Sequence, residues 1–558
     1  MDKRMNVKKI ITEWVPMIHA VISIVYEWVT ELSVENHSYE MMKVVPGNHI
    51  SFESEQIMFF VLSKLCGICL IYVLWNLIFY ICVKKKIHIV LLLLVGTILI
   101  LILYPNNYVL EVDNLMLFMN SISYYPDYWQ SIYIGVWYNA CLMVCRDSLI
   151  LPLVQTWLFI GAVCYLAEKS KERWGKVAGL VPYVLLILPE VVIICANPYR
   201  NAVYVVLGIW YYTMLFFSIA NKEKQTWKKL ILWSLFSAFM GLMRSEGILI
   251  LGVFCVACIW LWQCTKKQKI GALISLCIFI LVLGIPQKLG EKKYYGKDYQ
   301  IVNYMDALRN ILITQGADFG YDDAEKDLNV INEFVPIEIL RNSGLTGFRI
   351  YNYETQGTVN QTLKSKAEQV GFLDATSNII KNNLDIYLNY RLGNFISANG
   401  GYDEKNYQIS VDMQGYNEVQ GMLQQEYAKG VTVILENIWA QEWLSNEWHT
   451  EIYAKVYEIQ DAYYELLWHF RITWMLRLVS MIMLPVLSIS LVYKTRNRES
   501  LLCIVVSLTL LTQWVGIALF SPEARPVYYY PIFYFSLAWS WLMIQMLCAK
   551  EMEEKKAS

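Results

Sequence analysis

Two carboxylates follow directly on the third long apolar stretch of the sequence. Glu111 and Asp113 lie in a polar segment that begins near Tyr104. A carboxylate that is partly removed from water at a membrane surface can act as a general base near neutral pH. The same two acids could instead cap a helix end and stay solvated, and their spacing leaves both interpretations open.

A third acid and a group of aromatic residues follow in the same segment. Asp127 comes after a Tyr-Pro pair, and Tyr133, Trp137 and Tyr138 lie beyond it. Aromatic faces can stack on sugar rings, but Tyr and Trp also anchor helices at membrane interfaces. The segment 105–147 is long for a connection between two apolar stretches, so we expect it to hold part of a site.

Arg244 and Glu246 interrupt another apolar stretch. Charged side chains at such a break are costly unless they are paired or used. Residues two apart on a helix point to different faces, which disfavours a simple Arg244–Glu246 pair. Either an acid neutralises Arg244, or its guanidinium binds an anion such as phosphate, for which its fork of donors is suited. We expect that Arg244 binds an anion.

Similar chemistry recurs in two other connections. Tyr199 and Arg200 join two apolar stretches, and Glu523 and Arg525 lie between the last two. Each arginine could hold a phosphate, or it could pair with a neighbouring acid or a lipid headgroup.

Charges inside the apolar stretches are few. They are Lys64, Glu190 and Arg477. Arg477 lies near one end of its stretch, so we expect its long side chain to reach toward the interface.

The composition indicates the class of protein in which these charged and aromatic residues lie. Of the 558 residues, 56% are hydrophobic and 17% are charged, and the mean hydropathy is +0.36. A soluble domain has about 25% charged residues, so an ordinary soluble enzyme is excluded. A net charge of −1 provides no general field for nucleic acid.

The apolar stretches predict an all-α polytopic membrane protein with about 12 transmembrane helices. They lie at 10–32, 57–82, 87–104, 148–166, 177–195, 202–220, 230–243, 247–263, 270–286, 473–492, 500–519 and 527–548.

Basic residues give the orientation. With both termini in the cytoplasm, the short inner loops hold 24 Lys and Arg and the short outer loops hold five. This bias also favours two separate helices at 230–243 and 247–263. It places residues 287–472 outside the cell as a mainly helical domain, together with every connection singled out above.

Metal and nucleotide signals are weak. The 13 cysteines lie mostly in apolar stretches, the six histidines are scattered, and there is no P-loop pattern. We therefore expect no zinc site and no ATP-driven transport by this chain alone. No cofactor is implied, and a divalent cation is left open.

The order of these motifs resembles membrane glycosyltransferases of the GT-C superfamily, in particular bacterial RgtA/B/C/D-like and DUF6020-like proteins. The resemblance rests on the acidic segment 111–114, on 188–204, on 242–247 and more loosely on 521–525. It covers residues 87–286 best. The acidic segment follows the third stretch here but the first in the family, which implies an added N-terminal pair of helices.

The resemblance implies transfer of a sugar from a polyprenyl-phosphate donor to a glycan, lipid or protein acceptor outside the membrane. Asp113 would be the base, with Glu111 as the alternate, and Arg244, Arg200 and Arg525 would hold the lipid phosphate. Tyr199, Glu246, Glu523 and Asp127 would complete the binding site. The family's His-Pro pair in the acidic loop is missing, and Tyr125-Pro126-Asp127 stands nearby.

The predicted organisation has four parts. Residues 1–86 are the added helices, 87–286 the GT-C-like core with outer loop 105–147, 287–472 the extracytoplasmic domain, and 473–558 the last helices with a short cytoplasmic tail. A polysaccharide polymerase or ligase, or a flippase, is the alternative function. The sequence predicts neither the sugar nor the acceptor.

Overall fold

In this computed structural model the chain is described over sixteen stretches, and all statements below concern these. They are 9–27, 54–84, 86–103, 117, 121, 124, 126, 131–147, 149–188, 190–196, 200–294, 299–342, 370–400, 447–495, 497–521 and 526–557. Every regular element within them is a helix. The prediction of an all-α membrane protein is confirmed at this level.

Eight of the described helices are long and apolar enough to cross a membrane. They are Ile10–Glu27, Ile57–Lys84, Ile150–Trp174, Arg200–Ala220, Lys266–Gly290, Ile472–Lys494, Arg498–Phe520 and Tyr530–Glu551. Shorter apolar helices cover Ile87–Leu103, Ile132–Leu142 and Ser245–Leu261. The structure thus supports several membrane crossings.

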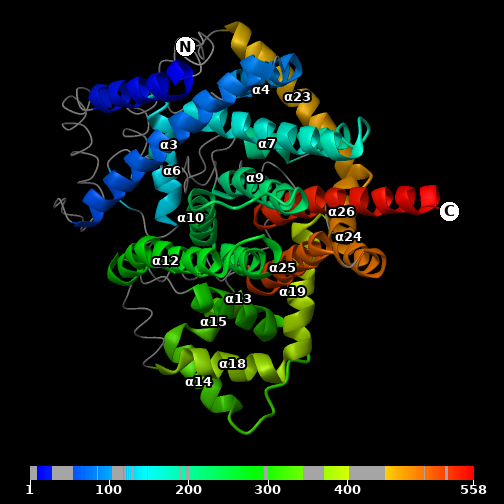
Figure 1. Cartoon of the computed structure of the whole chain (residues 1–558). Helices are drawn as coiled ribbons and strands as arrows, with labels where there is room; N and C mark the ends of the chain where they lie inside the picture. Colours follow the sequence, from blue (N-terminus) through cyan, green and yellow to red (C-terminus); the bar gives the residue numbers. More distant parts are fainter. Residues whose placement is uncertain are drawn as a thin grey trace.

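The apolar helices form one bundle (Figure 1). Its elements are α3 (Ser54–Lys84), α4 (Ile87–Leu103), α6 (Ile132–Leu142), α7 (Ile150–Trp174), η2 (Val181–Leu186), α8 (Val191–Ala196), α9 (Arg200–Ala220), α10 (Trp227–Met243), η3 (Ser245–Gly247), α11 (Ile248–Val256), η4 (Ala257–Leu261), α12 (Lys266–Tyr294), α24 (Ile472–Lys494), α25 (Arg498–Phe520), η7 (Pro526–Tyr528) and α26 (Tyr530–Ala557). The N-terminal helix begins with η1 (Ile10–Trp14) and packs on α3.

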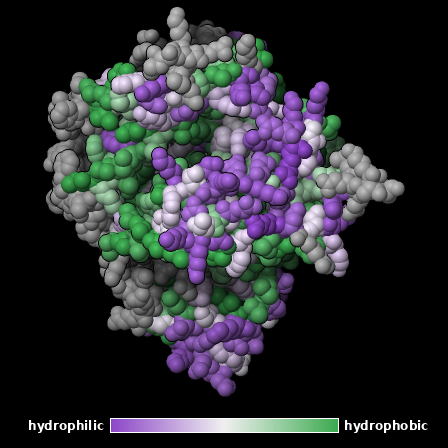
Figure 2. All heavy atoms as spheres, viewed as in Figure 1, coloured by the Kyte–Doolittle hydropathy of each residue, from purple (hydrophilic) through white to green (hydrophobic). Residues whose placement is uncertain are grey.

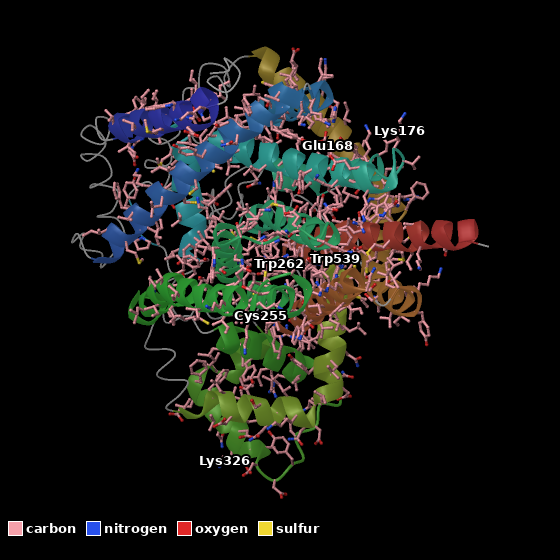
Figure 3. The ribbon with its side chains drawn as sticks, viewed as in Figure 1. Glu168, Lys176, Cys255, Trp262, Lys326 and Trp539 are labelled. Atoms are coloured by element: carbon pink, nitrogen blue, oxygen red, sulfur yellow. The ribbon has the colours of Figure 1, made fainter. Side chains whose placement is uncertain are left out.

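Helix α9 is the centre of this bundle. Nearly all its side chains are buried, between α7 on one side and α26 on the other. Gly208 permits the close approach of α26, because a Cβ there would lie 2.1 Å from the ring of Phe535. Trp262 and Trp539 lie in the same interior, whereas Lys176 and Lys326 lie at the periphery (Figure 3).

Helices α10 and α11 form an antiparallel pair, as the basic-residue count predicted. The ring of Trp233, in the first half of α10, lies 5.5 Å from that of Trp262, which follows η4. The chain reverses at Gly247, where a Cβ would lie 2.4 Å from the carbonyl oxygen of Met240. Only glycine fits this turn without moving the backbone, which places Arg244 and Glu246 at the tip of the pair.

The stretch 177–195 crosses the bundle without forming one helix. It runs back along α7 as η2 and then α8. The sequence has prolines at 182 and 189, and proline cannot donate a backbone hydrogen bond. The side-chain amide of Gln155 on α7 donates to the backbone carbonyl of Ile194. In an unbroken helix, this carbonyl would accept a hydrogen bond from a backbone N–H of the same helix.

The loops predicted to be cytoplasmic meet at one end of the bundle, which we call the Glu499 end. Arg173 at the end of α7 pairs with Glu499 at the start of α25 (2.8 Å), and it also donates to the carbonyl of Ala220 at the end of α9. Lys86 pairs with Glu168 near the same end of α7 (2.6 Å).

The loops predicted to be outside meet at the opposite end, which we call the Arg244 end. Ser131 donates to the carbonyl of Leu242 (2.8 Å), and Asn201 donates to the carbonyl of Val527 (2.9 Å). These hydrogen bonds bring the segments near Ser131, Leu242, Asn201 and Val527 to this end of the bundle.

A second group of helices has its own hydrophobic core. It consists of α13 (Tyr299–Ile313), α14 (Ala324–Phe334), α15 (Ile337–Asn342) and α18 (Phe372–Asn382). Their buried residues contact one another in a cluster separate from that of the bundle. Figure 2 shows hydrophilic residues gathered at the tip of this group, while hydrophobic residues cover much of the face over α3, α4 and α12.

Helix α19 (Leu384–Ala398) connects this group to the bundle, whereas α23 (Glu447–His469) packs against α4 and α24. In Figure 1, α19 runs from α18 to the helices α24–α26. Tyr387 donates to the carbonyl of Leu519 at 3.3 Å, and the ring of Phe395 lies 6.2 Å from that of Trp514. Helix α19 therefore lies across the Arg244 end of α25.

Candidate functional site

Arg244 and Glu246 form the best-defined polar cluster at the Arg244 end. The guanidinium of Arg244 donates from Nε and Nη2 to the two carboxylate oxygens of Glu246, at 3.0 and 2.7 Å. The Arg244 side chain is 8% exposed and that of Glu246 is 21% exposed. Such a two-point pair is among the stronger charge-assisted contacts in proteins.

The expectation that Arg244 and Glu246 would point to different faces is wrong. It assumed a helix through both residues, but Arg244 has extended backbone, with φ −145° and ψ 154°. Helix α10 ends at Met243 and the single turn η3 begins at Ser245. The extended residue turns the Arg244 side chain back over that turn, so the two charges meet despite their spacing.

Arg200 belongs to the same cluster. It begins α9, and its charge contributes to the electrostatic environment of the Glu246 carboxyl. Burial raises the pKa of that carboxyl, but the charge and hydrogen bonds of Arg244, with help from Arg200, bring it down to about 2. Glu246 is therefore ionised at neutral pH, and it is too weak a base to accept a proton from a sugar hydroxyl.

Two uncharged side chains complete the surroundings of the pair. The Cζ atom of Arg244 lies 5.8 Å from the centre of the Tyr204 ring, on α9. The amide of Gln513, on α25, donates to the backbone carbonyl of Glu246 at 3.1 Å. Side chains of α9 and α25 thus contact the Arg244–Glu246 pair at the end of α10.

One donor of Arg244 remains unused. Its Nη1 atom is buried and has no hydrogen-bond partner among the described residues. A buried donor without a partner costs about 1–3 kcal/mol, and more when the group is charged. Together with the nearby charge of Arg200, this donor gives the cluster the character of an anion-binding site with one acidic residue already bound.

The remaining predicted site residues lie outside the described part of the chain. They are Glu111, Asp113, Asp127, Tyr199, Glu523 and Arg525. Their described neighbours are at the Arg244 end: Arg200 follows Tyr199, and the Asn201–Val527 hydrogen bond fixes the residues that flank two of these segments. The structure therefore brings together Arg200, Arg244 and Glu246. The assignment of Asp113 as the base stays a prediction, because that residue lies outside the described part of the chain.

The aromatic residues after Asp127 are part of the core. Tyr133, Trp137 and Tyr138 are 1%, 5% and 0% exposed and belong to the main hydrophobic cluster. They lie on α6, which packs along α3. They are thus available neither to a sugar ring nor to the membrane interface, because the short helix that carries them is enclosed on nearly all faces.

Arg477 is also placed differently from the prediction. It is 1% exposed and pairs with Glu190, which is 1% exposed, at 2.7 Å. It donates further to the carbonyl of Ala398 at the end of α19 (2.9 Å). Two partners remote in the sequence hold this side chain inside the protein, so it does not extend toward the interface.

Lys64 on α3 likewise has protein partners. Its ammonium group pairs with Glu27 of the N-terminal helix and donates to the hydroxyl of Tyr124 at 2.5 Å. It also lies 4.9 Å from the centre of the Phe60 ring. Lys64 thereby links the N-terminal helix to the segment that contains the predicted catalytic acids.

Arg391 on α19 was not singled out from the sequence. It is 3% exposed and donates to the carbonyl of Ser521 at 2.8 Å, and its Cζ atom lies 5.2 and 5.3 Å from the centres of the Tyr387 and Tyr390 rings. Its stretch is not apolar enough to mark an arginine as unusual, so the sequence contained no signal for it. It brings a further cation to the Arg244 end.

Candidate metal ligands do not gather in the described residues. No group of three or more His, Cys, Asp or Glu side chains there could hold a metal ion. All thirteen cysteines are free thiols, including the two Cys-x-x-Cys pairs at 66 and 69 and at 255 and 258. Comparison with known families, curated proteins and solved structures found no match for this chain.

Proposed function

We propose that this protein is a membrane glycosyltransferase that moves a sugar from a polyprenyl-phosphate donor to an acceptor on the extracytoplasmic side. The observation that carries the proposal is the buried guanidinium of Arg244, which keeps an unused donor at Nη1 and has the second cation Arg200 nearby. The planar fork of the Arg244 guanidinium suits one phosphate of a lipid carrier, and the charge of Arg200 adds to the attraction.

The proposed chemistry is an inverting transfer. Asp113, or Glu111 as the alternate, removes the proton of the acceptor hydroxyl, and the hydroxyl oxygen then attacks the anomeric carbon. The bond from that carbon to the phosphate oxygen breaks, and its electron pair leaves with the polyprenyl phosphate. Arg244 and Arg200 stabilise the charge that grows on this leaving group. Glu246 positions Arg244 and takes no proton.

The remaining predicted residues have supporting roles in this proposal. Arg525, Glu523, Tyr199 and Asp127 contribute to the binding of the donor or the acceptor. The contact between Asn201 and Val527 favours this grouping, because it joins the connections that contain Tyr199 and Arg525. The proposed chemistry does not itself require a divalent cation.

We further propose the GT-C fold with twelve membrane crossings, cytoplasmic termini and residues 287–472 outside. Support comes from the basic residues of the short loops and from the meeting of those loops at the Glu499 end. A cysteine introduced at Asp412 should react with an impermeant maleimide in intact cells whose outer envelope is opened. The parent chain is the control, and labelling only after membrane disruption would contradict the orientation.

The test of the activity is mass spectrometry of cell-envelope glycans and lipid-linked intermediates, with and without the protein. Loss of one sugar from a glycan, with accumulation of its polyprenyl-phosphate donor, supports transfer. Loss of chain length, with accumulation of complete lipid-linked repeats, would indicate a polymerase or ligase instead. Movement of labelled lipid across sealed vesicles without bond formation would indicate a flippase.

A further inference from the structure

Helix α23 has an apolar stripe that the protein does not cover. Ile452, Ile459 and Leu466 recur every seven residues, which places them on one helix face, and Phe470 continues that line. They are 37%, 71%, 54% and 58% exposed. The described part of the chain therefore leaves three large apolar side chains exposed along a helix that does not itself qualify as a membrane span, and a fourth just after its last residue.

The face of α23 that adjoins the stripe is charged. Glu451, Glu458 and Glu465 also recur every seven residues, and all three are exposed. A helix with one apolar face and one charged face is suited to the boundary between lipid and water. With five acidic residues and one lysine in its 23 residues, α23 is not attracted to anionic headgroups.

The rotation of α23 about its axis is fixed by the bundle. The hydroxyl of Tyr463 donates to the carbonyl of Ile187 at 2.7 Å, and Leu467 is 8% exposed. These residues lie beside the stripe on the helix, at its inner edge. The contacts hold one part of the apolar face against the protein and turn the adjoining part outward.

The neighbours of α23 identify what covers the stripe. It packs against α4 and α24, two apolar helices whose outward residues include Leu91, Leu94, Val479 and Ile482, each roughly half exposed. The chain passes from α23 into α24 within two residues, through Arg471 with φ 51°. The stripe thus belongs to a helix whose two neighbours expose apolar surface of the kind that a bilayer covers.

We propose that α23 is an interfacial helix whose stripe of Ile452, Ile459, Leu466 and Phe470 lies in the bilayer boundary where α24 begins. Its acidic face points to water. The apolar face of such a helix reaches about 5–10 Å into the region between headgroups and acyl chains. The proposal does not depend on the glycosyltransferase activity or on which end of the bundle is cytoplasmic.

The test measures the environment of single positions in the protein reconstituted in phosphatidylcholine vesicles. Nitroxide labels are attached through a keto amino acid, which avoids the free cysteines, at 459 and 466 on the stripe and at 458 and 465 on the acidic face. Oxygen concentrates in lipid and a nickel chelate in water. We expect oxygen to dominate relaxation at 459 and 466 and the nickel chelate to dominate at 458 and 465.

Two results would overturn the proposal. Equal nickel access at all four positions would place the stripe in water, and low access of both reagents at 459 and 466 would mean that a protein covers it. Adding phosphatidylglycerol should leave the pattern unchanged, because the charged face is acidic; a pattern that appears only with this lipid would also contradict the proposal.

A pair of variants provides a second measurement. Ile459→Glu places a charge on the stripe and should raise nickel access at 466 several-fold, since the helix lifts from the lipid. Ala454→Glu adds the same charge on the exposed polar side and should leave access at 466 unchanged. Identical responses to the two substitutions would show that the stripe has no special relation to the bilayer.

Discussion

Glu190 and Arg477 lie 287 residues apart in the sequence, and their side chains form an ion pair of 2.7 Å in the interior of the protein. The pair joins the start of α8 to α24, and Arg477 also holds the last carbonyl of α19. Three parts of the chain therefore meet at one guanidinium, near the end of the bundle that contains Arg244.

The first prediction concerns this pair. Arg477→Met leaves the Glu190 carboxylate buried without its cation, and the loss of one partner of a buried pair costs about 3–5 kcal/mol. Glu190→Leu should cost a similar amount. The double variant should be less destabilised than either single variant, as judged by thermal unfolding in detergent. A double variant whose loss equals the sum of the two would contradict this coupling.

The second prediction concerns Arg244. Arg244→Lys keeps the charge but loses the planar fork, so affinity for a polyprenyl-phosphate analogue or turnover should fall while the protein still folds. Arg244→Ala should reduce both further. Arg173→Lys is the matched control, since it alters an Arg–Glu pair at the opposite end. Normal binding by both folded Arg244 variants would exclude this residue as the phosphate ligand, and failure of Arg244→Ala to fold would favour a structural pair.

The third prediction concerns the base. Asp113→Asn preserves size and removes the charge, so turnover should fall roughly 10²–10⁴-fold while donor binding persists. Glu111→Gln serves as the comparison two residues away. Loss of turnover in Glu111→Gln alone would transfer the role to Glu111, and unchanged turnover in both variants would remove this segment from the chemistry.

The fourth prediction concerns pH. The pKa of Glu246 is about 2 in the folded protein, against an ordinary value of 4.5. Its ionised form therefore stabilises the fold above pH 4.5, and that contribution disappears as the pH falls toward 2. Thermal unfolding between pH 5 and pH 3 should decline more steeply for the parent than for Glu246→Gln. Parallel declines would mean that the carboxylate does not stabilise Arg244.

The sequence by itself determined the membrane class and the position of the break at Arg244. Both follow from local quantities: the length of apolar stretches, the placement of basic residues and the presence of a Gly after two charges. The antiparallel pair α10 and α11 was predicted for this reason. The stretch 177–195 was also recognised, and its prolines are visible in the sequence, but only the structure shows that Gln155 of a neighbouring helix donates to the carbonyl of Ile194.

The tertiary structure alone decided the partners of the charges. Spacing argued against the Arg244–Glu246 pair, and nothing local linked Glu190 to Arg477 or Arg391 to Ser521. Whether a charge in an apolar stretch is paired depends on which helices pack together. The residue pattern of one helix does not indicate which other helices will contact it. Low dielectric then makes those remote contacts decisive, because a buried charge without a partner is too costly to retain.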